Sequence, residues 1–453
     1  MTVRARLFPL LLAGLWFAQA SAVASGYYGP AAKNPAATAR RPVPVWMPRY
    51  RRPRVFTGID VLAEGNFSVL RGKRIGLLTH AAAVNRDGVP TVDVLLHAPG
   101  VKLVSLFATE HGIWNTMPAG RPFPDHIDPR TGLPVHSLYN GRSHEPTAAQ
   151  LRGIDALVID LQDIGVRSYT FSGTMKLAMQ GCFKHHVEVI ILDRPDPLGG
   201  LKVDGPLPDP GLVGSSLMCE FPVPYVHGLT MGELAELAKG TPGVLQVTPR
   251  QLKRGRLTVV RMVGWRRSMR WPETGLRWIP TSPEIGDFGA VVGYAMTGLG
   301  CGPPIDNFRH GVDGQYWFRA VSNRYVKPAV VARDLRDLRL PGIHFREISV
   351  TNPRTGRPGM GLYVEVTDWD EWRPTELSFY LMQLACKLEP RNPFAWATRD
   401  ERTIFLHEVG SAALLHDLAT RGARTDIAGY LRRWWSQDRA FAEWSRRFWL
   451  YPD

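Results

Sequence analysis

Between residues 73 and 193 the chain alternates short apolar runs with segments that have the spacing of amphipathic helices. The apolar runs are nearly continuous, which is typical of strands that are buried on both faces of a sheet. This alternation predicts parallel strands joined by right-handed crossovers, with helices on both faces. The predicted strands cover residues 73–80, 101–108, 155–163 and 187–193, and the predicted helices cover 91–98, 147–154 and 172–186.

The regular alternation fades near residue 240. Because 453 residues exceed what one hydrophobic core usually holds, we expect two domains, over residues 57–240 and 241–453. In the second, aromatic residues recur at intervals of three and four near the C-terminus, which predicts an amphipathic helix that docks on the rest of the protein. Its other predicted elements are strands over 256–265 and 361–369 and a helix over 374–388.

The N-terminus has the pattern of a secretory signal peptide over residues 1–24. Two arginines precede an apolar stretch from 7 to 17, and small residues of the A-x-A kind follow it. The apolar stretch is short for a membrane span, although an uncleaved N-terminal anchor stays open as an alternative. Residues 25–56 are rich in Pro, Ala, Gly and Arg, which predicts a disordered linker. We therefore expect a periplasmic or secreted protein with no membrane span after signal cleavage.

The formal net charge of +14 would attract an anionic partner, and a solvated basic surface without such a partner is the alternative. Export argues against nucleic acid as that partner and favours a cell-wall polymer. The sequence does not indicate an oligomeric state.

The four cysteines form no C-x-x-C pair, which excludes a zinc ribbon and a thioredoxin-like motif. An oxidising compartment allows two disulfides among them, and buried free thiols are the alternative. These residues are Cys182, Cys219, Cys301 and Cys386.

Polar side chains follow each of the four predicted strands of the first domain. Open parallel sheets bind ligands beyond the carboxyl ends of their strands, so these side chains are expected to share one crevice. They are Thr79 and His80 after the first strand, Glu110 and His111 after the second, Asp160, Gln162 and Asp163 at the third, and Asp193, Arg194 and Asp196 at the fourth.

Several chemistries compete for this crevice. The chain has no G-x-S-x-G elbow for a serine nucleophile, and the turn after the first strand has no dinucleotide fingerprint. A metal site built from His80, Glu110, His111 and Asp193 is an alternative, but these residues lack ligand spacing. Carboxylate acid–base chemistry, as in glycoside hydrolysis, fits the acidic groups directly. We therefore expect neither a metal nor a cofactor.

A series of motifs then indicates a family. In order, they are "GIDVL" (58–62), "GKRIGLLTH" (72–80), "TEHGI" (109–113), "DPRTGLPVHSLY" (128–139), "DLQDIGVRSYTF" (160–171), "LDRPDPLGG" (192–200), "GWRRSM" (264–269) and the C-terminal "WSQDRAFAEWSRRFWLY". From about Thr57 to its end, the chain resembles the DUF1343 family, which contains the NamZ-type exo-β-N-acetylmuramidases.

The resemblance implies an α/β fold, with a Rossmann-like parallel-sheet domain, a smaller α+β C-terminal auxiliary domain and the active site between them. It also implies release of N-acetylmuramic acid from the non-reducing ends of peptidoglycan fragments, so the expected partner is a muramic-acid-containing glycan or muropeptide. Glu110 matches the family's proposed catalytic acid. Its partner carboxylate stays open among Asp160, Asp163 and Asp193, and so does the choice between retention and inversion.

The resemblance further implies a set of substrate-binding residues. An arginine among them would suit the lactyl carboxylate of muramic acid through a bidentate pair, and an ion pair of Arg194 with Asp193 or Asp196 is the alternative. The set comprises His80, His111, Gln162, Arg167, Tyr169, Asp193 and Arg194.

The chain departs from the family pattern in three places. His80-Ala81 stand where the family usually has Asn-Gln, and residues 113–120 replace a polar segment that contains Gly and Asp. Residues 296–311 lack two glutamates that are usual in the family, and Glu284 and Asp306 lie nearby without matching them. An exported glycoside hydrolase is therefore weighed against two alternatives, a non-catalytic muropeptide-binding relative and a metal-assisted hydrolase.

Overall fold

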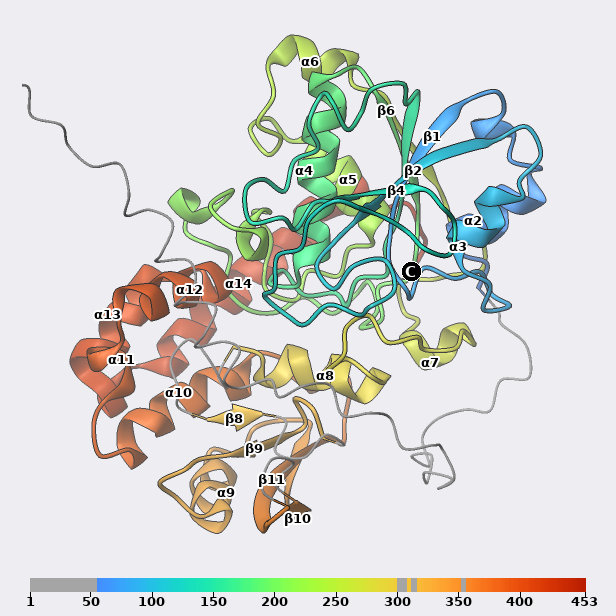
Figure 1. Ribbon diagram of the computed structural model, residues 1–453. Coiled ribbons are helices and arrows are strands. Elements are labelled where there is room, and N and C mark those ends of the chain that lie inside the picture. Colours follow the sequence, from blue (N-terminus) through green and yellow to red (C-terminus); the bar gives the residue numbers. More distant parts are fainter. Residues whose placement is uncertain (1–54, 300–307, 311–315, 352–355) are drawn as a thin grey trace, which may run out of the picture.

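The computed structural model describes residues 55–299, 308–310, 316–351 and 356–453 (Figure 1). The predicted signal peptide and nearly all of the predicted linker lie outside these residues. Figure 1 shows a large sheet flanked by helices, and a smaller sheet that lies beside the C-terminal helices. Helices α7 (Trp271–Thr274) and α8 (Phe288–Thr297) lie between the two sheets.

The large sheet has the strand order β3-β4-β2-β1-β5-β6-β7. Neighbouring strands are parallel except for β3 and β4. The parallel strands follow the doubly wound order, and the order reverses between β1 and β5. The bounds are β1 Arg74–Thr79, β2 Lys102–Ala108, β3 His126–Ile127, β4 Pro134–Ser137, β5 Ala156–Asp160, β6 Glu188–Leu192 and β7 Leu257–Val260.

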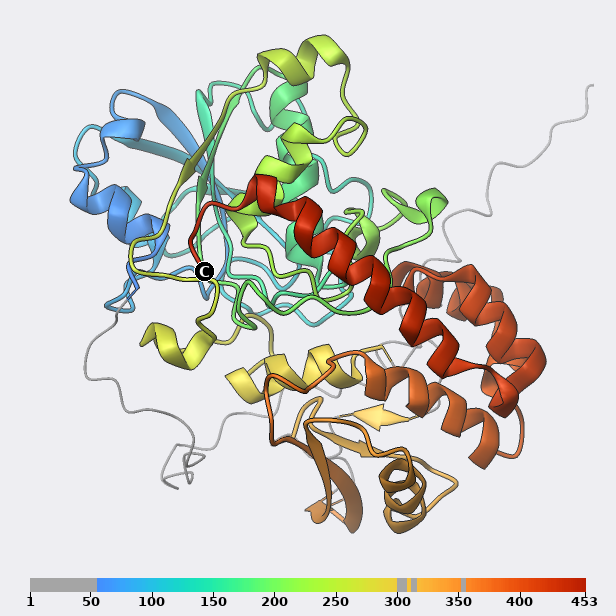
Figure 2. The ribbon, with the colours of Figure 1, turned by 180° about the vertical axis from the view of Figure 1, so that it is seen from behind.

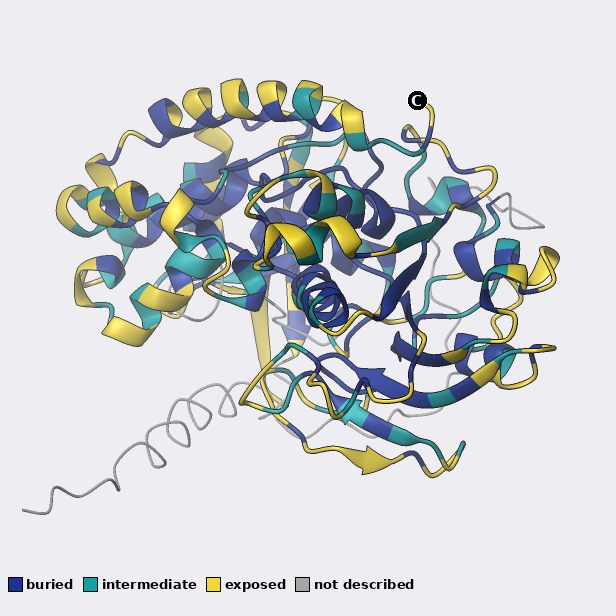
Figure 3. Ribbon diagram, turned by 90° about the horizontal axis from the view of Figure 1, so that it is seen from above, coloured by how far each residue is buried: buried dark blue, intermediate teal, exposed yellow. Residues whose placement is uncertain are grey.

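Both faces of this sheet are covered, as the continuous apolar strands predict. Strands β5 and β6 are buried at every position, and Figure 3 shows dark blue central strands between helices that are exposed on their outer faces. Helix α5 begins with a capping box between Thr230 and Glu233, which fixes its start against the sheet. The helices of this part are α2 Gly58–Glu64, α3 Thr91–Leu96, α4 Thr170–Lys184, α5 Met231–Gly240 and α6 Pro249–Arg254.

The four predicted strands are confirmed as β1, β2, β5 and β6, and two of the three predicted helices as α3 and α4. The helix predicted over 147–154 is wrong. Thr147 Oγ1 accepts a hydrogen bond from Gln150 N (3.3 Å), as a helix cap would, but only turns follow before Gly153 adopts a φ of 76°. Strand β7 pairs with β6, so the sheet extends beyond the predicted boundary at residue 240.

The second part contains an antiparallel sheet in the order β10-β11-β9-β8, followed by helices. Strand β11 and helix α10 confirm the predicted strand over 361–369 and the predicted helix over 374–388. The bounds are β8 Arg309–His310, β9 Ala320–Ser322, α9 Pro328–Asp337, β10 Ile343–Thr351, β11 Pro358–Val366, α10 Glu376–Leu388, α11 Pro393–Trp396, α12 Arg399–Val409, α13 Ala412–Arg421 and α14 Ile427–Ser445.

Helix α14 runs from the C-terminal helices to the large sheet (Figure 2). Its aromatic residues Trp434 and Phe441 are buried in a core shared with the sheet, which confirms the predicted docking face. Beyond the helix, Tyr451 Oη donates a hydrogen bond to Asp193 Oδ2 (2.6 Å), and Leu450 N donates to Glu233 Oε1 (2.9 Å). The C-terminal tail thus supplies donors to two buried carboxylates of the first part.

Three of the cysteines, Cys182, Cys219 and Cys386, are free thiols, whereas Cys301 lies outside the described residues. Burial raises the pKa of Cys182, which makes it unreactive at neutral pH. Within the described ranges, no helix is both long and apolar enough to cross a membrane.

Buried carboxyl groups gather where the two parts meet. Asp204 Oδ2 accepts hydrogen bonds from the backbone N and Oγ1 of Thr375 (2.8 and 2.7 Å), and Asp438 Oδ2 accepts one from Gly205 N (3.2 Å). Burial raises the pKa of Asp438 to about 9 and that of Glu376 to about 7, and the charge of Asp204 acts in the same direction on both. Asp438 therefore keeps its proton in the folded protein at neutral pH.

We predict that the free energy of unfolding falls by about 3–5 kcal/mol between pH 6 and pH 9. These two carboxyls titrate near pH 4 in the unfolded chain, so across this window the folded state holds protons that the unfolded state has released. Stability is therefore lost as the pH rises through the folded pKa values.

Urea unfolding at several pH values measures this dependence. The variant Asp438→Asn cannot ionise, so its stability should fall less steeply with pH. The exposed Asp337→Asn serves as the control and should keep the wild-type dependence. An unchanged slope in Asp438→Asn would contradict the assignment.

Candidate active site

Glu110 directly follows β2, at the edge of the sheet where the strands end. Its carboxylate is buried, and it accepts hydrogen bonds at Oε1 from Gly120 N (2.6 Å) and at Oε2 from Thr170 Oγ1 (2.9 Å). Thr170 is the first residue of α4, so the positive end of that helix dipole lies next to the carboxylate. Burial and the nearby charge of Glu110 raise the pKa of Tyr139, which follows β4.

A tight turn after β2 gives Glu110 one of its two hydrogen-bond donors. His111 and Gly112 both adopt left-handed backbone conformations, with φ values of 71° and 76°. His111 makes two contacts with Met117. Its ring nitrogen Nδ1 lies 3.0 Å from Met117 O, and its carbonyl O accepts a hydrogen bond from Met117 N (3.1 Å). The left-handed conformation is unfavourable for a histidine, and it directs the chain back so that Gly120 reaches Glu110.

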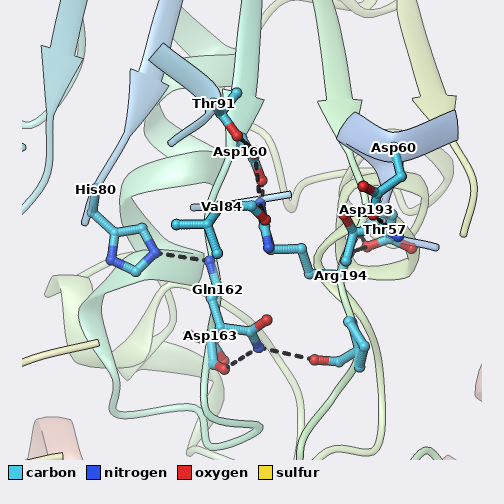
Figure 4. Close-up of polar contacts among 12 residues, drawn as sticks. Thr57, Asp60, His80, Val84, Thr91, Asp160, Gln162, Asp163, Asp193 and Arg194 are labelled. Carbon is cyan, nitrogen blue, oxygen red and sulfur yellow. Dashed lines mark hydrogen bonds and ion pairs between the residues drawn. The ribbon is translucent and has the colours of Figure 1, made fainter. Parts of the chain in front are cut away.

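His80 and Gln162 connect the ends of β1 and β5, where the strand order reverses (Figure 4). His80 Nε2 accepts a hydrogen bond from Gln162 N (2.9 Å), so this nitrogen carries no proton. Burial lowers the pKa of His80 well below its ordinary value, and Arg194 and His111 act in the same direction. The imidazole is therefore neutral and positions two strand ends, which differs from the substrate contact predicted for it.

Asp163 and Asp196 form a buried carboxyl pair behind the crevice. Asp163 Oδ2 accepts a hydrogen bond from Gly165 N (3.1 Å), and Asp196 Oδ1 accepts one from Leu198 N (2.9 Å). Burial raises the pKa of Asp163 to about 7, and burial followed by the charge of Asp163 raises that of Asp196. Glycine is required at 165, because a Cβ there would lie 2.3 Å from Asp196 Oδ1.

Asp160 and Asp193, two further predicted site carboxylates, are occupied by structural contacts. Asp160 forms a buried bidentate ion pair with Arg194 and accepts a hydrogen bond from Thr91 Oγ1 (2.5 Å) (Figure 4). Asp193 accepts hydrogen bonds from Tyr451 Oη and Thr230 Oγ1 (2.6 and 2.7 Å). Both are fully buried, so the geometry gives them a scaffold role rather than the predicted contact with a reacting group.

The two arginines predicted to bind a substrate carboxylate are engaged by groups of the protein. Arg194 forms its ion pair with Asp160, and not with Asp193 or Asp196 as the sequence alternative had it. Arg167 is buried and donates to the backbone carbonyls of Glu408 and Val409 (both 3.1 Å), which joins the two parts of the protein. Arg167 is thereby held away from the crevice, whereas Arg194, although paired with Asp160, lines a pocket next to the strand-order reversal.

The donor groups of Tyr169 and Gln162 are engaged by the protein, whereas Gln162 Oε1 is buried without a hydrogen-bond partner among the described residues. Tyr169 Oη donates to Thr281 Oγ1 (2.9 Å), and Gln162 Nε2 donates to the carbonyls of Asp163 and Pro195 (2.8 and 3.0 Å). Gln162 also lines a pocket next to the strand-order reversal. Its other lining residues are Thr57, Ala82, Val84, Asn85, Arg86, Asp87, Gly88, Arg194, Trp271, Leu276, Arg277 and Ile279, so Glu110 lies outside it.

The structure brings three residues to Glu110 that the sequence reasoning did not select: Tyr139, Thr170 and Glu284. Tyr139 follows a strand that was not predicted, and Thr170 is a helix-start residue of ordinary appearance. Glu284 lies 174 residues after Glu110 in the chain, on a segment without strand or helix pattern, and only the fold brings the two residues near each other. Among the described residues, no group of three or more His, Cys, Asp or Glu could hold a metal ion.

Two protein-family models match consecutive parts of the chain. The N-terminal model of exo-β-N-acetylmuramidase NamZ matches residues 75–289, and the C-terminal model matches residues 292–451. Together they cover both parts of the structure, and they divide the chain at the start of α8.

Individual relatives agree with these matches. The chain is 34% identical over 345 residues to the peptidoglycan β-N-acetylmuramidase NamZ of Bacillus subtilis (strain 168), covering 76% of this chain and 80% of that one. The crystal structure of a DUF1343 family protein from Bacteroides fragilis NCTC 9343 matches with a TM-score of 0.78 and 35% identity, over 88% of this chain and all of that one. A second DUF1343 protein of that organism, at 22% identity and a TM-score of 0.65, has the same fold over 88% of this chain and 99% of its own. The predicted α/β fold is confirmed.

We predict that Asp160→Asn destabilises the protein by about 3–5 kcal/mol, because it leaves the buried Arg194 guanidinium without its counter-charge. Urea unfolding measures the loss. The control is Asp93→Asn, whose ion pair with Arg130 is largely exposed (3.4 Å) and should cost less than about 1 kcal/mol. A similar small cost at Asp160 would contradict its scaffold role.

Proposed function

The chain belongs to the NamZ family of exo-β-N-acetylmuramidases (DUF1343), and on this basis we propose that it is a glycosidase that releases N-acetylmuramic acid from the non-reducing ends of peptidoglycan fragments. The NamZ relative in Bacillus subtilis is named a peptidoglycan β-N-acetylmuramidase, and this chain is similar to it over most of both lengths. The predicted partner, a muramic-acid-containing glycan or muropeptide, follows from the same relationship.

One observation carries the proposal at the level of residues. Glu110 stands at the carboxyl end of β2, where open parallel sheets bind their ligands, and two donors fix the orientation of its carboxylate. Glycoside hydrolysis needs a carboxyl group held in a set geometry beside the bond that breaks. We therefore propose that Glu110 takes part directly in acid–base catalysis.

Among the partner carboxylates considered from the sequence, Asp163 fits acid–base chemistry better than Asp160 or Asp193. Its pKa of about 7 lies close to neutral pH, and its Oδ1 has no hydrogen-bond partner among the described residues. The same oxygen is buried, however, so Asp163 would act on the substrate through the groups that it positions. After burial, the charge of Asp163 contributes to raising the pKa of Tyr169. Tyr169 Oη in turn donates a hydrogen bond to Thr281, three residues before Glu284.

We also propose that the protein is exported. The support is the sequence pattern of residues 1–24, together with a peptidoglycan substrate that lies outside the cytoplasmic membrane. Of the segment 296–311, which departs from the family pattern, residues 300–307 and 311 lie outside the described residues.

We predict that Glu110→Gln slows release of nitrophenol from 4-nitrophenyl β-N-acetylmuramide by about 10²–10⁴-fold, because the amide keeps the shape of the carboxylate but has neither its negative charge nor its capacity to accept a proton. The control is Glu443→Gln, an exposed glutamate on α14, which should keep wild-type turnover.

Three outcomes would count against the prediction or the proposed function. Equal activity of wild type and Glu110→Gln would remove Glu110 from the reaction. Saturable muropeptide binding by the wild type without any product would favour a non-catalytic binding protein. Activity that a chelator abolishes and zinc restores would favour a metal-assisted hydrolase.

We predict that residues 1–56 direct a fused alkaline phosphatase out of the cytoplasm, where its disulfides form and the reporter becomes active. Leu12→Arg places a charge in the apolar stretch of the signal and should abolish reporter activity. The control Asn34→Arg adds the same charge in the linker and should leave activity unchanged. An inactive fusion with the wild-type segment would contradict export.

A further inference from the structure

The segment 278–285, between α7 and α8, crosses to the crevice and carries Glu284 with it. Two contacts join it to the loops around Glu110. Asn115 Nδ2, from the turn after β2, donates to Pro280 O (3.3 Å), and Tyr169 Oη, just before α4, donates to Thr281 Oγ1 (2.9 Å). The segment is also closed on itself, because Trp278 Nε1 donates to Ile285 O (3.0 Å). It therefore has a defined position over the strand ends.

Glu284 differs from Asp160 and Asp193 because its carboxyl group is free to contact a bound substrate. It is half-buried, whereas Asp160 and Asp193 are fully buried and saturated with donors. In the part of the chain that the structure describes, its carboxyl group has no ion pair and no hydrogen bond to another side chain. Such a group can turn toward a bound substrate by giving up only a hydrogen bond with its own backbone.

Glu284 also lies within electrostatic reach of Glu110. Burial raises the pKa of Glu284, His111 lowers it, and Glu110 raises it. Glu110 itself is held by two donors at the N-terminus of α4. Two neighbouring carboxyl groups in such different surroundings are suited to different roles in one reaction.

Resting on the proposed glycosidase function, we propose that Glu284 is the proton donor of the reaction and that Glu110 is its charged partner. Glu284 transfers its proton to the glycosidic oxygen while the bond from that oxygen to C1 breaks, and the electron pair of the bond stays with the departing oxygen. Water supplies a hydroxyl group to C1, and its proton returns to the carboxyl pair. The sum is the hydrolysis of one glycosidic bond with no other reactant.

The test compares two substrates that differ in their need for a proton. An N-acetylmuramyl-β-1,4-N-acetylglucosamine disaccharide has a poor leaving group, whereas nitrophenolate departs from 4-nitrophenyl β-N-acetylmuramide with little assistance. Glu284→Gln should slow the disaccharide about 10²–10⁴-fold and the nitrophenyl substrate less than about tenfold. Glu110→Gln should slow both, and Glu443→Gln should slow neither.

The pH profile gives a second readout that a merely structural role would not move. Wild-type kcat/KM for the disaccharide should fall on the alkaline side as the donor loses its proton, and Glu284→Gln should lose this alkaline limb. Disaccharide turnover at the wild-type rate in Glu284→Gln, or an equal loss on both substrates, would overturn the role of Glu284 while leaving the glycosidase function in place. A wild type inactive on both substrates would overturn both.

Discussion

The reversal of strand order between β1 and β5 is the constraint on which the rest of the structure depends. Crossovers leave these two strands in opposite directions, so their carboxyl ends are not covered by a connecting helix and a crevice remains. The hydrogen bond from Gln162 N to His80 Nε2 holds the two ends at a fixed separation across that crevice. Every group that we place in the reaction lies on a segment that begins at this edge or packs against it.

Acidic residues near the edge divide into two classes by their partners. Both Asp160 and Asp193 are buried, and the charge of Asp160 is compensated by Arg194. Asp193 instead accepts hydrogen bonds from neutral donors, which include Thr230 and Tyr451. Asp163 and Glu284 accept fewer hydrogen bonds than these two residues, and burial raises the pKa of Asp163 and Glu284 as it also does that of Asp193. The scaffold is thus built from satisfied carboxylates, and the proposed proton donor, Glu284, is one of the under-satisfied carboxyl groups.

The strands of the first domain and the position of Glu110 were predictable, because continuous apolar runs are a direct signature of a sheet buried on both faces. The role of Asp160 could not be predicted, because a strand-end aspartate has the same sequence pattern whether it pairs with Arg194 or contacts a substrate. Glu284 was also beyond reach, because its segment has no periodicity and is placed by contacts with Asn115 and Tyr169. The false helix at 147–154 arose because Thr147 caps a turn as it would cap a helix.

The segment that carries Glu284 is anchored in both parts of the protein. On one side, Trp278 packs edge-on against Trp271 (4.9 Å between centroids), and Trp271 N donates to Pro197 O (3.0 Å) in the loop after β6. On the other side, Asp287 caps α8 and pairs with Arg319 (3.2 Å) in the second part. The distance between these anchors depends on how the two parts dock. The placement of Glu284 beside Glu110 therefore requires both parts of the protein in their docked arrangement. The tail contact of Tyr451 with Asp193, although remote from the crevice, therefore contributes to the geometry of the site.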